Sequence, residues 1–386
     1  MNIIHKLNTQ NNLCSIHFFW PINLEAEKNN LGIGIFLLAM LLKGSKHFNA
    51  HNLALKLESN AINFNFCRTA NYLNLSLLFE KNSITEAINI FSEIFLNPKF
   101  DHQEIEKLKL EQVNAITARY DTISNICIDH FKQNIYGKDN YKSWLPLGDK
   151  TSLTKISQND LIDFHQKYLL NFKPIISAVT PFKNFKFPDI FGKKKLTISP
   201  ISDNLITPPK TENITKNFNQ AYIMLGFKIP DIRDKEFLKI KLINSYLGGG
   251  MTSLLFDRIR EQMGLVYEIG STITTTADTN YFMIHLGLDK KNIKAALIAI
   301  DEEITNFKIK ESDIKILKRR MKSTEIFKQE TKGNQAFLLG LYEILGLEQN
   351  YSYQNLKNLD KIQTVNLERT AKTFFKQQKF VKTIIQ

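Results

Sequence analysis

The second half of this 386-residue chain repeats the pattern of its first half. Residues 153–161 read Leu-x-Lys-Ile-x-x-x-x-Leu, and residues 359–367 match them position for position. An apolar, strand-like segment follows each match, at Ile175 and at Val381. A match that holds in register across both halves is typical of a duplicated supersecondary unit. We therefore predict two similar domains.

Apolar periodicity predicts the elements of each half. In the first half we expect strands at Cys14–Trp20, Ile62–Cys67, Tyr72–Phe79 and Ile175–Val179, and helices at Gly32–Leu42, Asn49–Ser59, Ile84–Leu96 and, as one rod or a broken pair, Gln103–Tyr136. In the second half we expect strands at Tyr222–Phe227, Val266–Thr274 and Tyr281–Leu286, and helices at Lys235–Tyr246 and Lys291–Phe307. The fold class is α+β: two homologous α/β sandwich domains, each a mixed or antiparallel sheet with helices packed on one face.

A change in composition separates the two predicted domains. The stretch 187–219 is rich in Pro, Lys and Asn, which is typical of an interdomain linker. We therefore predict an N-terminal domain over 1–186, a linker over 187–219 and a C-terminal domain over 220–386. A length of 386 residues is comfortable for two cores of this size.

The distribution of charge and the cysteines limit the classes of function that fit this chain. The formal charge of +13 comes from lysines scattered along the predicted helices, and no basic stripe interleaved with stacking aromatics predicts nucleic-acid binding. The apolar run Gly32–Leu42 is too short to span a bilayer, so we expect no membrane span. Three widely spaced cysteines and an N-terminus without an apolar signal region favour a cytoplasmic location over a periplasmic one.

The stretch Tyr246–Gly270 carries the most specific local pattern. Gly248, Gly249 and Gly250 interrupt an amphipathic run, after which Thr252 or Ser253 is suited to cap a short helix. Gly264 is suited to the left-handed turn that ends this helix, and a strand is expected to follow. Arg260 and Tyr267 lie on the two sides of that turn, so we expect their side chains to converge. A guanidinium and a phenol both donate hydrogen bonds to a peptide carbonyl, although a surface Arg and a half-buried strand Tyr would give the same local pattern.

The sequence Gly-Gly-Gly-Met-Thr-Ser-Leu-Leu-Phe, followed by Arg-Glu-Gln-x-Gly-Leu-x-Tyr, resembles the C-terminal half of the pitrilysin-like (inverzincin) metallopeptidases. Insulin-degrading enzyme, the mitochondrial processing peptidase and paired bacterial homologues belong to this family. In its active members, an Arg and a Tyr with this spacing contact the substrate. The resemblance therefore implies substrate binding by Arg260 and Tyr267, within two similar halves that enclose a cavity.

The same resemblance exposes a lost metal site. The family carries His-x-x-Glu-His in the first helix of the N-terminal half, with both histidines on one face and the Glu as general base. Here the frame Gly-x-x-His-Phe-Leu-Glu-His-Met becomes Gly-Ile-Gly-Ile-Phe-Leu-Leu-Ala-Met, so that Ile35, Leu38 and Ala39 occupy the ligand, base and ligand positions. Aliphatic side chains bind no zinc. We predict no metal, no cofactor and no catalytic residue in this chain.

Two nearby features offer no replacement site. The distal Glu ligand of the family aligns at Asn114 or Ala115, with Glu111 close by but without partners for a metal. His47 and His51 are four residues apart, but His47 is expected to precede the helix, so we interpret both as solvent-facing.

This chain keeps the Arg and Tyr pair and lacks the zinc ligands, and this combination matches a zinc-less subunit. In several branches of the family one subunit supplies zinc and base, and a homologous partner supplies the Arg and Tyr. The resemblance implies a heterodimer with a zinc-bearing subunit that processes peptides or unfolded proteins. Two alternatives remain open: a structural subunit, like the family members that became core proteins of a respiratory complex, and a standalone peptide-binding chamber.

Overall fold

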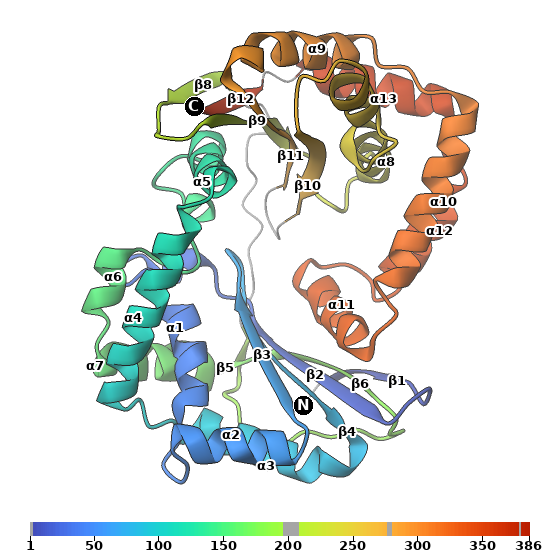
Figure 1. The fold of residues 1–386 in the computed structure, drawn as a ribbon. Coiled ribbons are helices and arrows are strands. Elements are labelled where there is room, and N and C mark those ends of the chain that lie inside the picture. The colour runs from blue at the N-terminus through green and yellow to red at the C-terminus, as the bar shows by residue number, and fades with distance from the viewer. Residues whose placement is uncertain (1–2, 196–207, 276–279, 378–379) are drawn as a thin grey trace. The chain divides into compact units, whose positions relative to one another are not determined.

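The computed structural model describes residues 3–195, 208–275, 280–377 and 380–386 (Figure 1). The chain divides into two compact units, each assembled from three separate stretches. Unit 1 contains Met1–Ala118, Trp144–Ile198 and Phe327–Gln349, and unit 2 contains Arg119–Ser143, Ser199–Ile326 and Asn350–Gln386.

Unit 1 is built on a five-stranded sheet in the order β1-β6-β2-β4-β3. Its strands are β1 (Ile3–Leu7), β2 (Leu13–Trp20), β3 (Asn63–Arg68), β4 (Leu73–Glu80) and β6 (Ile175–Thr180). Only the edge pair β1–β6 is parallel among these strands, and the other three pairs are antiparallel. Alternate residues of β2, among them Ile16, Phe18 and Trp20, enter the hydrophobic core of this unit.

Helices of the first half of the chain supply the rest of that core. They are α1 (Ile33–Met40), α2 (Ala50–Ser59), α3 (Ile84–Leu96), α4 (His102–Arg119), α6 (Lys150–Lys155) and α7 (Gln158–Phe164), with single-turn segments η1 (Leu24–Glu27), η2 (Leu41–Lys43), η3 (Lys81–Ser83) and η5 (His165–Leu170). α3 has a clear amphipathic pattern and buries Ala87, Ile90, Phe91, Ile94 and Phe95. The side chain of Asn49 caps α2 by accepting from the N–H of Asn52 at 2.8 Å.

Unit 2 repeats this sheet in the order β10-β11-β9-β12-β8. Its strands are β8 (Lys210–Ile214), β9 (Gln220–Ile229), β10 (Glu268–Thr274), β11 (Asn280–Asp289) and β12 (Val381–Ile385). The edge pair β8–β12 is parallel and the other three pairs are antiparallel, as in unit 1. The two sheets therefore share one topology, and the predicted duplication and fold class are confirmed.

The helices of unit 2 are α5 (Ile123–Tyr136), α8 (Phe237–Gly248), α9 (Ile293–Thr305), α10 (Glu311–Phe327), α12 (Tyr351–Leu359) and α13 (Thr364–Gln377), with short segments η4 (Tyr141–Ser143), η6 (Phe256–Gln262) and η7 (Lys290–Asn292). α8, α9 and α13 pack on the face of the sheet that carries Ile223, Leu225 and Phe227.

Each sheet also carries one helix that comes from the other half of the chain. α11 (Lys332–Ile344) packs against β2 and β6 of unit 1, and α5 packs against β9 and β12 of unit 2 (Figure 1). Lys332 holds the start of α11 in place, because its buried ammonium donates to the carbonyls of Asn8, Asn11 and Leu13 at 2.7 to 2.8 Å. The sequence pattern did not predict this exchange of helices. Because of it, helices lie on both faces of each sheet, and the expectation of helices on one face alone is wrong.

The predicted boundaries differ from the compact units for that reason. The contiguous domains 1–186 and 220–386 assign α5 and α11 to the wrong sheets, since both helices belong to the opposite unit. The predicted linker 187–219 is also partly structured. Phe187 and Phe191 enter the core of unit 1, the pair β5 (Phe172–Lys173) and β7 (Lys194–Lys195) is parallel, and β8 is an edge strand. β8 is polar because it lies at an edge, so periodicity misses it; residues 196–207 of the linker lie outside the described residues.

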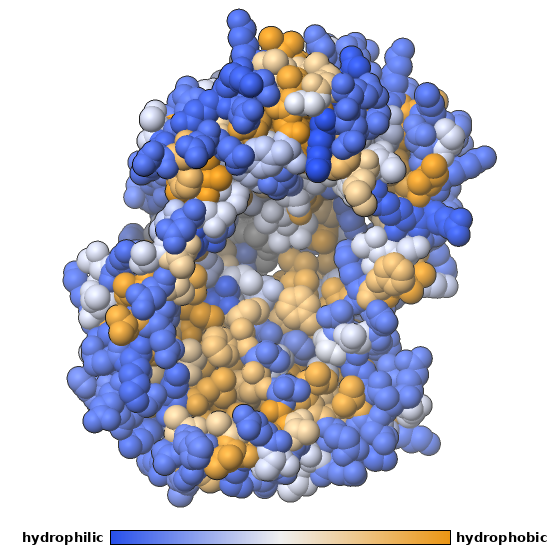
Figure 2. All heavy atoms as spheres, viewed as in Figure 1, coloured by the Kyte–Doolittle hydropathy of each residue, from blue (hydrophilic) through white to orange (hydrophobic). Residues whose placement is uncertain are grey.

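Hydrophilic residues cover much of the surface on the face drawn in Figure 2. Among the described helices, none has both the length and the apolar character needed to cross a membrane.

Candidate functional site

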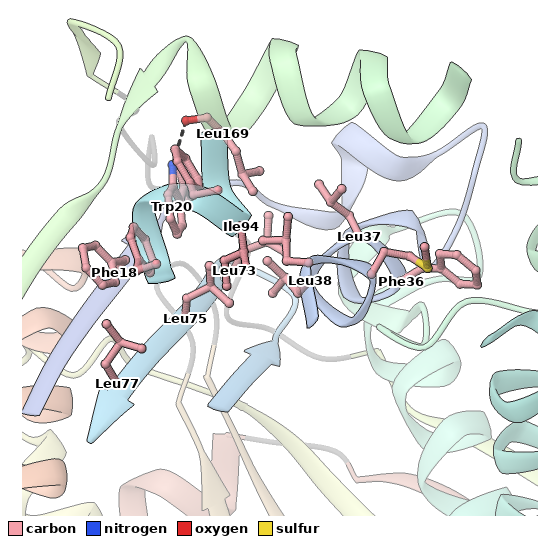
Figure 3. Close-up of a cluster of buried hydrophobic side chains, with 14 of the residues drawn as sticks. Phe18, Trp20, Phe36, Leu37, Leu38, Leu73, Leu75, Leu77, Ile94 and Leu169 are labelled. Atoms are coloured by element: carbon pink, nitrogen blue, oxygen red, sulfur yellow. Dashed lines mark hydrogen bonds between the residues drawn. The ribbon is translucent and has the colours of Figure 1, made fainter. Parts of the chain in front are cut away.

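α1 carries the three positions at which the family places zinc ligands and base, and the structure puts them in or beside the core of unit 1. Leu38 is fully buried, and Figure 3 shows its side chain next to Leu73 and Ile94. Ala39 is partly buried and packs against the same core, and Ile35 is half-buried. This face of α1 is packed hydrocarbon.

These residues do not fit a zinc ion. Zinc needs nitrogen, sulfur or carboxylate donors, and none of Ile35, Leu38 and Ala39 supplies one. In the described part of the chain, no group of three or more His, Cys, Asp or Glu side chains is placed to hold a metal. Glu111, near the expected distal ligand, lies 3.7 Å from the ammonium of Lys43, with most of its side chain exposed.

The start of α1 is held by a buried ion pair. Glu27 accepts from the guanidinium Nε of Arg68 at 2.6 Å, and both side chains are fully buried. The other carboxylate oxygen of Glu27 accepts the backbone N–H groups of Gly32 and Gly34 at 3.2 Å, which satisfies donors at the helix start. Burial lowers the pKa of Arg68 and the carboxylate opposes that shift. The contacts that hold the start of α1 are thus present, although the helix carries no metal ligands.

The two histidines at 47 and 51 make no joint site. His47 precedes α2, as expected, and its Nδ1 lies 2.8 Å from the carboxylate of Glu93. His51 is exposed on the first turn of the helix. Two of the other histidines serve the core: His17 lies 3.3 Å from the side-chain oxygen of Asn74, and His165 is buried against aromatic rings.

The glycine-rich turn connects α8 to the next helical segment. α8 ends at Gly248, and Gly249 and Gly250 lie beside the guanidinium of Arg320 on α10. A surface cavity of about 350 Å³ opens there, with the 80% exposed Met251 in its lining. Gly248 is thus still the last helical residue, and the interruption predicted for the three glycines begins at Gly249.

Arg260 lies on the π-helical segment η6, one turn before Gly264. Gly264 has a φ of +60°, which is the left-handed conformation expected at that turn. The guanidinium of Arg260 lies 4.7 Å from the centroid of the Phe256 ring and 3.7 Å from the carboxylate of Glu261. With 41% of its side chain exposed, the guanidinium keeps donors open to solvent.

Tyr267 directly precedes β10 in the chain. Its backbone N–H donates to the carbonyl of Gly287 at 3.1 Å, and its ring occupies the space beside that glycine. A Cβ at position 287 would come within 2.6 Å of the ring and of the phenolic oxygen. Burial, followed by the charges of Glu268 and Asp289, raises the pKa of Tyr267, so the phenol stays protonated and able to donate at neutral pH.

No hydrogen bond or cation–π contact joins Arg260 and Tyr267 in the described structure. Both side chains are partly exposed, Tyr267 with 41% of its surface, and both flank the Gly264 turn. We predict that Arg260 and Tyr267 donate hydrogen bonds to the same peptide carbonyl when a substrate is bound, and this stays a prediction.

The contact between Gly287 and Tyr267 gives a testable prediction. We expect Gly287→Ala to push the Tyr267 ring off the sheet and to lower the free energy of unfolding by about 1 to 3 kcal/mol, as overpacking does. In a Tyr267→Ala background the same change should cost much less, because the ring that it strikes is gone. Chemical denaturation of the four proteins of this cycle measures the coupling. Equal costs in both backgrounds would mean that the ring does not rest on Gly287 in solution.

Sequence reasoning missed three residues around Tyr267. The phenol of Tyr222 on β9 donates to Oε1 of Glu268 at 3.1 Å, and Nε2 of His285 on β11 lies 3.8 Å from the same oxygen. The available signal was Gly287, since a glycine inside a strand marks a close approach of another group.

Two family models match this chain. The model of the insulinase peptidases, family M16, matches residues 23–145, and the model of the peptidase M16 inactive domain matches residues 155–321. The first match contains α1 with Ile35, Leu38 and Ala39, and the second contains the glycine-rich turn, Arg260 and Tyr267. The order of the two models agrees with the resemblance found in the sequence.

Relatives and solved structures match over most of the chain. The non-peptidase homolog YmxG of Helicobacter pylori is 25% identical over 87% of this chain and 80% of its own length. The uncharacterized zinc protease YmxG of Bacillus subtilis is 24% identical over 88% of this chain and 83% of its own length. The structure of a peptidase M16 inactive domain from Pseudomonas fluorescens has a TM-score of 0.88 at 17% identity, covering 99% of this chain and 95% of that one. The chain therefore belongs to peptidase family M16, and the models of its two domains match the chain one after the other.

Proposed function

We propose that this chain is the non-catalytic, zinc-less subunit of a heterodimeric M16 peptidase. A homologous partner with an intact His-x-x-Glu-His motif carries the zinc and the general base. This chain contributes substrate binding through Arg260 and Tyr267. The substrate is an extended peptide or an unfolded protein segment.

The observation that carries the proposal is the contrast between the two candidate sites. On α1, hydrocarbon has replaced every group that zinc chemistry needs, and Leu38 is fully buried. At the Gly264 turn, by contrast, Arg260 and Tyr267 keep exposed donors, and Gly287 leaves room for the Tyr267 ring. The word "non-peptidase" in the name of the Helicobacter pylori relative agrees with a chain that does not cleave peptides by itself.

The role of this chain in turnover is to bind and orient. A protonated phenol and a guanidinium donate hydrogen bonds to a backbone carbonyl of the extended substrate. Donors that are fixed before the substrate arrives stabilise the oxyanion that develops during peptide cleavage. The substrate itself lies as an added strand on a sheet edge of the partner.

The rival function is a structural subunit without a role in proteolysis. A scaffold has no need of hydrogen-bond donors at Arg260 and Tyr267. The exposure of both side chains beside the Gly264 turn therefore favours the subunit that binds substrate over the structural subunit. A standalone peptide-binding chamber would keep those donors, but it would need no partner for its function.

The proposal predicts where zinc and activity lie. Neither this chain nor its partner should cleave peptides alone, and the mixture should do so. Elemental analysis should find about one zinc per heterodimer and none in this chain, because only the partner has donors for it. The measurement is peptide turnover and metal content of each chain and of the complex isolated by size-exclusion chromatography.

Two results would contradict the proposal. A stoichiometric zinc in this chain alone would mean that the assignment of the lost metal site is wrong. A stable complex that has no more activity than the partner alone would favour the structural subunit.

A further inference from the structure

A cavity of about 490 Å³ lies beside α5 in unit 2, and the proposed function makes no use of it. Its first wall is one face of that helix, formed by residues three and four positions apart: Ile126, Asp129, His130 and Gln133. Its second wall is the loop 216–218, which connects β8 to β9. The volume is in the range of sites for small organic ligands, about 300 to 1,000 Å³.

Both walls are held by contacts within unit 2. The guanidinium of Arg119 donates to both carboxylate oxygens of Asp129, at 2.7 and 3.2 Å, and so fastens the turn that carries Tyr120 to α5. The backbone N–H of Lys216 donates to the carbonyl of Gln386 at 2.7 Å, which ties the loop to the residue that follows β12. A cavity with walls fixed in this way costs a ligand little ordering of the protein.

The two carboxylates at this cavity already have partners. Asp129 lines it but is paired with Arg119. Glu212 does not line it, and its Oε2 accepts from the amide of Asn134 at 2.8 Å. The same oxygen lies 3.4 Å from the buried Nδ1 of His130, whose ring lines the cavity. Neither carboxylate is therefore left to attract a cation.

The hydrogen-bond donors of the cavity, by contrast, are unused. In the part of the chain that the structure describes, the side chains of Lys216, Gln133 and Asn217 line the cavity without a hydrogen bond or an ion pair. The ammonium of Lys216 thus adds a positive charge that no carboxylate balances. An ammonium and two amides are donors suited to one carboxylate.

The remaining lining is apolar and aromatic. Phe218 and Tyr120 contribute rings, the latter with 42% of its surface exposed, and Ile126 contributes aliphatic surface. Such surface favours a ligand with a ring or a branched aliphatic group. A single ammonium balances the charge of a carboxylate, whereas it would leave part of the charge of a phosphate dianion without a partner.

We propose that this cavity binds a carboxylate that is attached to an apolar group. The carboxylate accepts from the ammonium of Lys216 and from the neighbouring amides, and the apolar group lies against Phe218 and Tyr120. Two kinds of molecule carry this chemistry, a free organic acid and the C-terminal residue of a peptide. The site shares no residue with Arg260 and Tyr267 and needs no partner subunit, so it goes beyond the proposed function.

The test is a calorimetric titration of the purified chain with N-acetylphenylalanine and two matched probes. The amide of N-acetylphenylalanine lacks the charge, and N-acetylglycine lacks the ring. We expect the acid to bind about tenfold more tightly than its amide, as for one charge-assisted hydrogen bond. We expect a similar advantage over N-acetylglycine, because the ring buries apolar surface.

A peptide distinguishes the two sources of the carboxylate. The probe is an unstructured hexapeptide of Gly and Ser that ends in Phe with a free carboxylate. If it binds more tightly than N-acetylphenylalanine, the preceding backbone contributes and the ligand is a peptide C-terminus. If it binds no more tightly, the site takes a free organic acid.

Variants tie the binding to the named residues. Lys216→Met should abolish the preference for the acid over its amide while binding of the amide stays the same, and the exposed position should tolerate the change. Lys294→Met on α9 removes the same charge from an exposed position outside the cavity and should leave the preference intact. Phe218→Leu should weaken binding of N-acetylphenylalanine more than binding of N-acetylglycine.

The site and the proposed function fail separately. Equal affinity for the acid and its amide, no measurable binding of the acid, or a preference that survives Lys216→Met overturns the site. None of these measurements involves the partner or peptide turnover, so an inactive heterodimer would overturn the proposed function and leave the site in place.

Discussion

The Leu38→Glu variant will unfold at a temperature about 10 °C lower than the parent chain and will gain no zinc. The change restores the general-base residue of the family, but it places a carboxylate where the side chain is fully buried in hydrocarbon. An uncompensated buried charge costs about 3 to 5 kcal/mol. Unit 1 has roughly 200 residues, a size at which each kcal/mol lowers the midpoint by about 2 to 4 °C, so the loss corresponds to the stated shift.

The cost should depend on pH in a definite direction. Burial raises the pKa of an introduced carboxyl, so between the unfolded and folded pKa values the folded chain binds more protons than the unfolded chain. The free energy of unfolding therefore falls as the pH rises through that window. Thermal unfolding at pH 5 and pH 8 should show the larger gap between variant and parent at pH 8.

A matched control separates burial from the substitution itself. Leu110 on α4 has 64% of its surface exposed, so Leu110→Glu should leave the midpoint nearly unchanged. If Leu38→Glu is as stable as the Leu110→Glu control, the face of α1 that carries Leu38 is not core, and the assignment of the lost metal site to this helix is wrong.

The parts of the fold that could be predicted from sequence are those with a strong local pattern. β2 is predicted because its apolar residues stop at Pro21, and α1 because its apolar run ends before a glycine. The closing segments of the two halves match because each leads into the same position of a sheet, the strand next to the parallel edge strand, at β6 and at β12.

The exchange of α5 and α11 could not be predicted, because nothing local states which sheet a helix will cover. Lys332 illustrates the difficulty. In the sequence it is one lysine among many, whereas in the fold it is buried and its ammonium meets three carbonyls of residues near the N-terminus. The structural role of such a residue is visible only in its tertiary contacts.

The residues of the candidate site also fall into those that the sequence predicts and those that only the fold reveals. Arg260 and Tyr267 stand out through a motif with fixed spacing, which sequence preserves. Glu268, Tyr222 and His285 come from three strands that are neighbours only in the folded sheet, so no spacing connects them. The glycine at 287 is the one sign in the sequence that another group lies close to the strand.

The largest effect on activity is expected at Arg260 and Tyr267. In the reconstituted heterodimer, Arg260→Ala removes the guanidinium and Tyr267→Phe removes only the hydroxyl. If these donors strengthen their hydrogen bonds in the transition state, each variant should lower kcat by about one to three orders of magnitude, as for other oxyanion donors. If they hold the substrate equally in the ground state, KM should rise while kcat stays the same.

Assembly provides the control for this experiment. Both groups are partly exposed, and neither takes part in the core of unit 2, so both variants should form the complex and unfold at the parent temperature. Tyr267→Phe is the sharper test, because the ring remains over Gly287 and only one oxygen is lost. Size-exclusion chromatography confirms the complex before turnover is measured. If both variants assemble and turn over peptides at the parent rate, Arg260 and Tyr267 are relics of the family, and the chain acts as a scaffold for its partner.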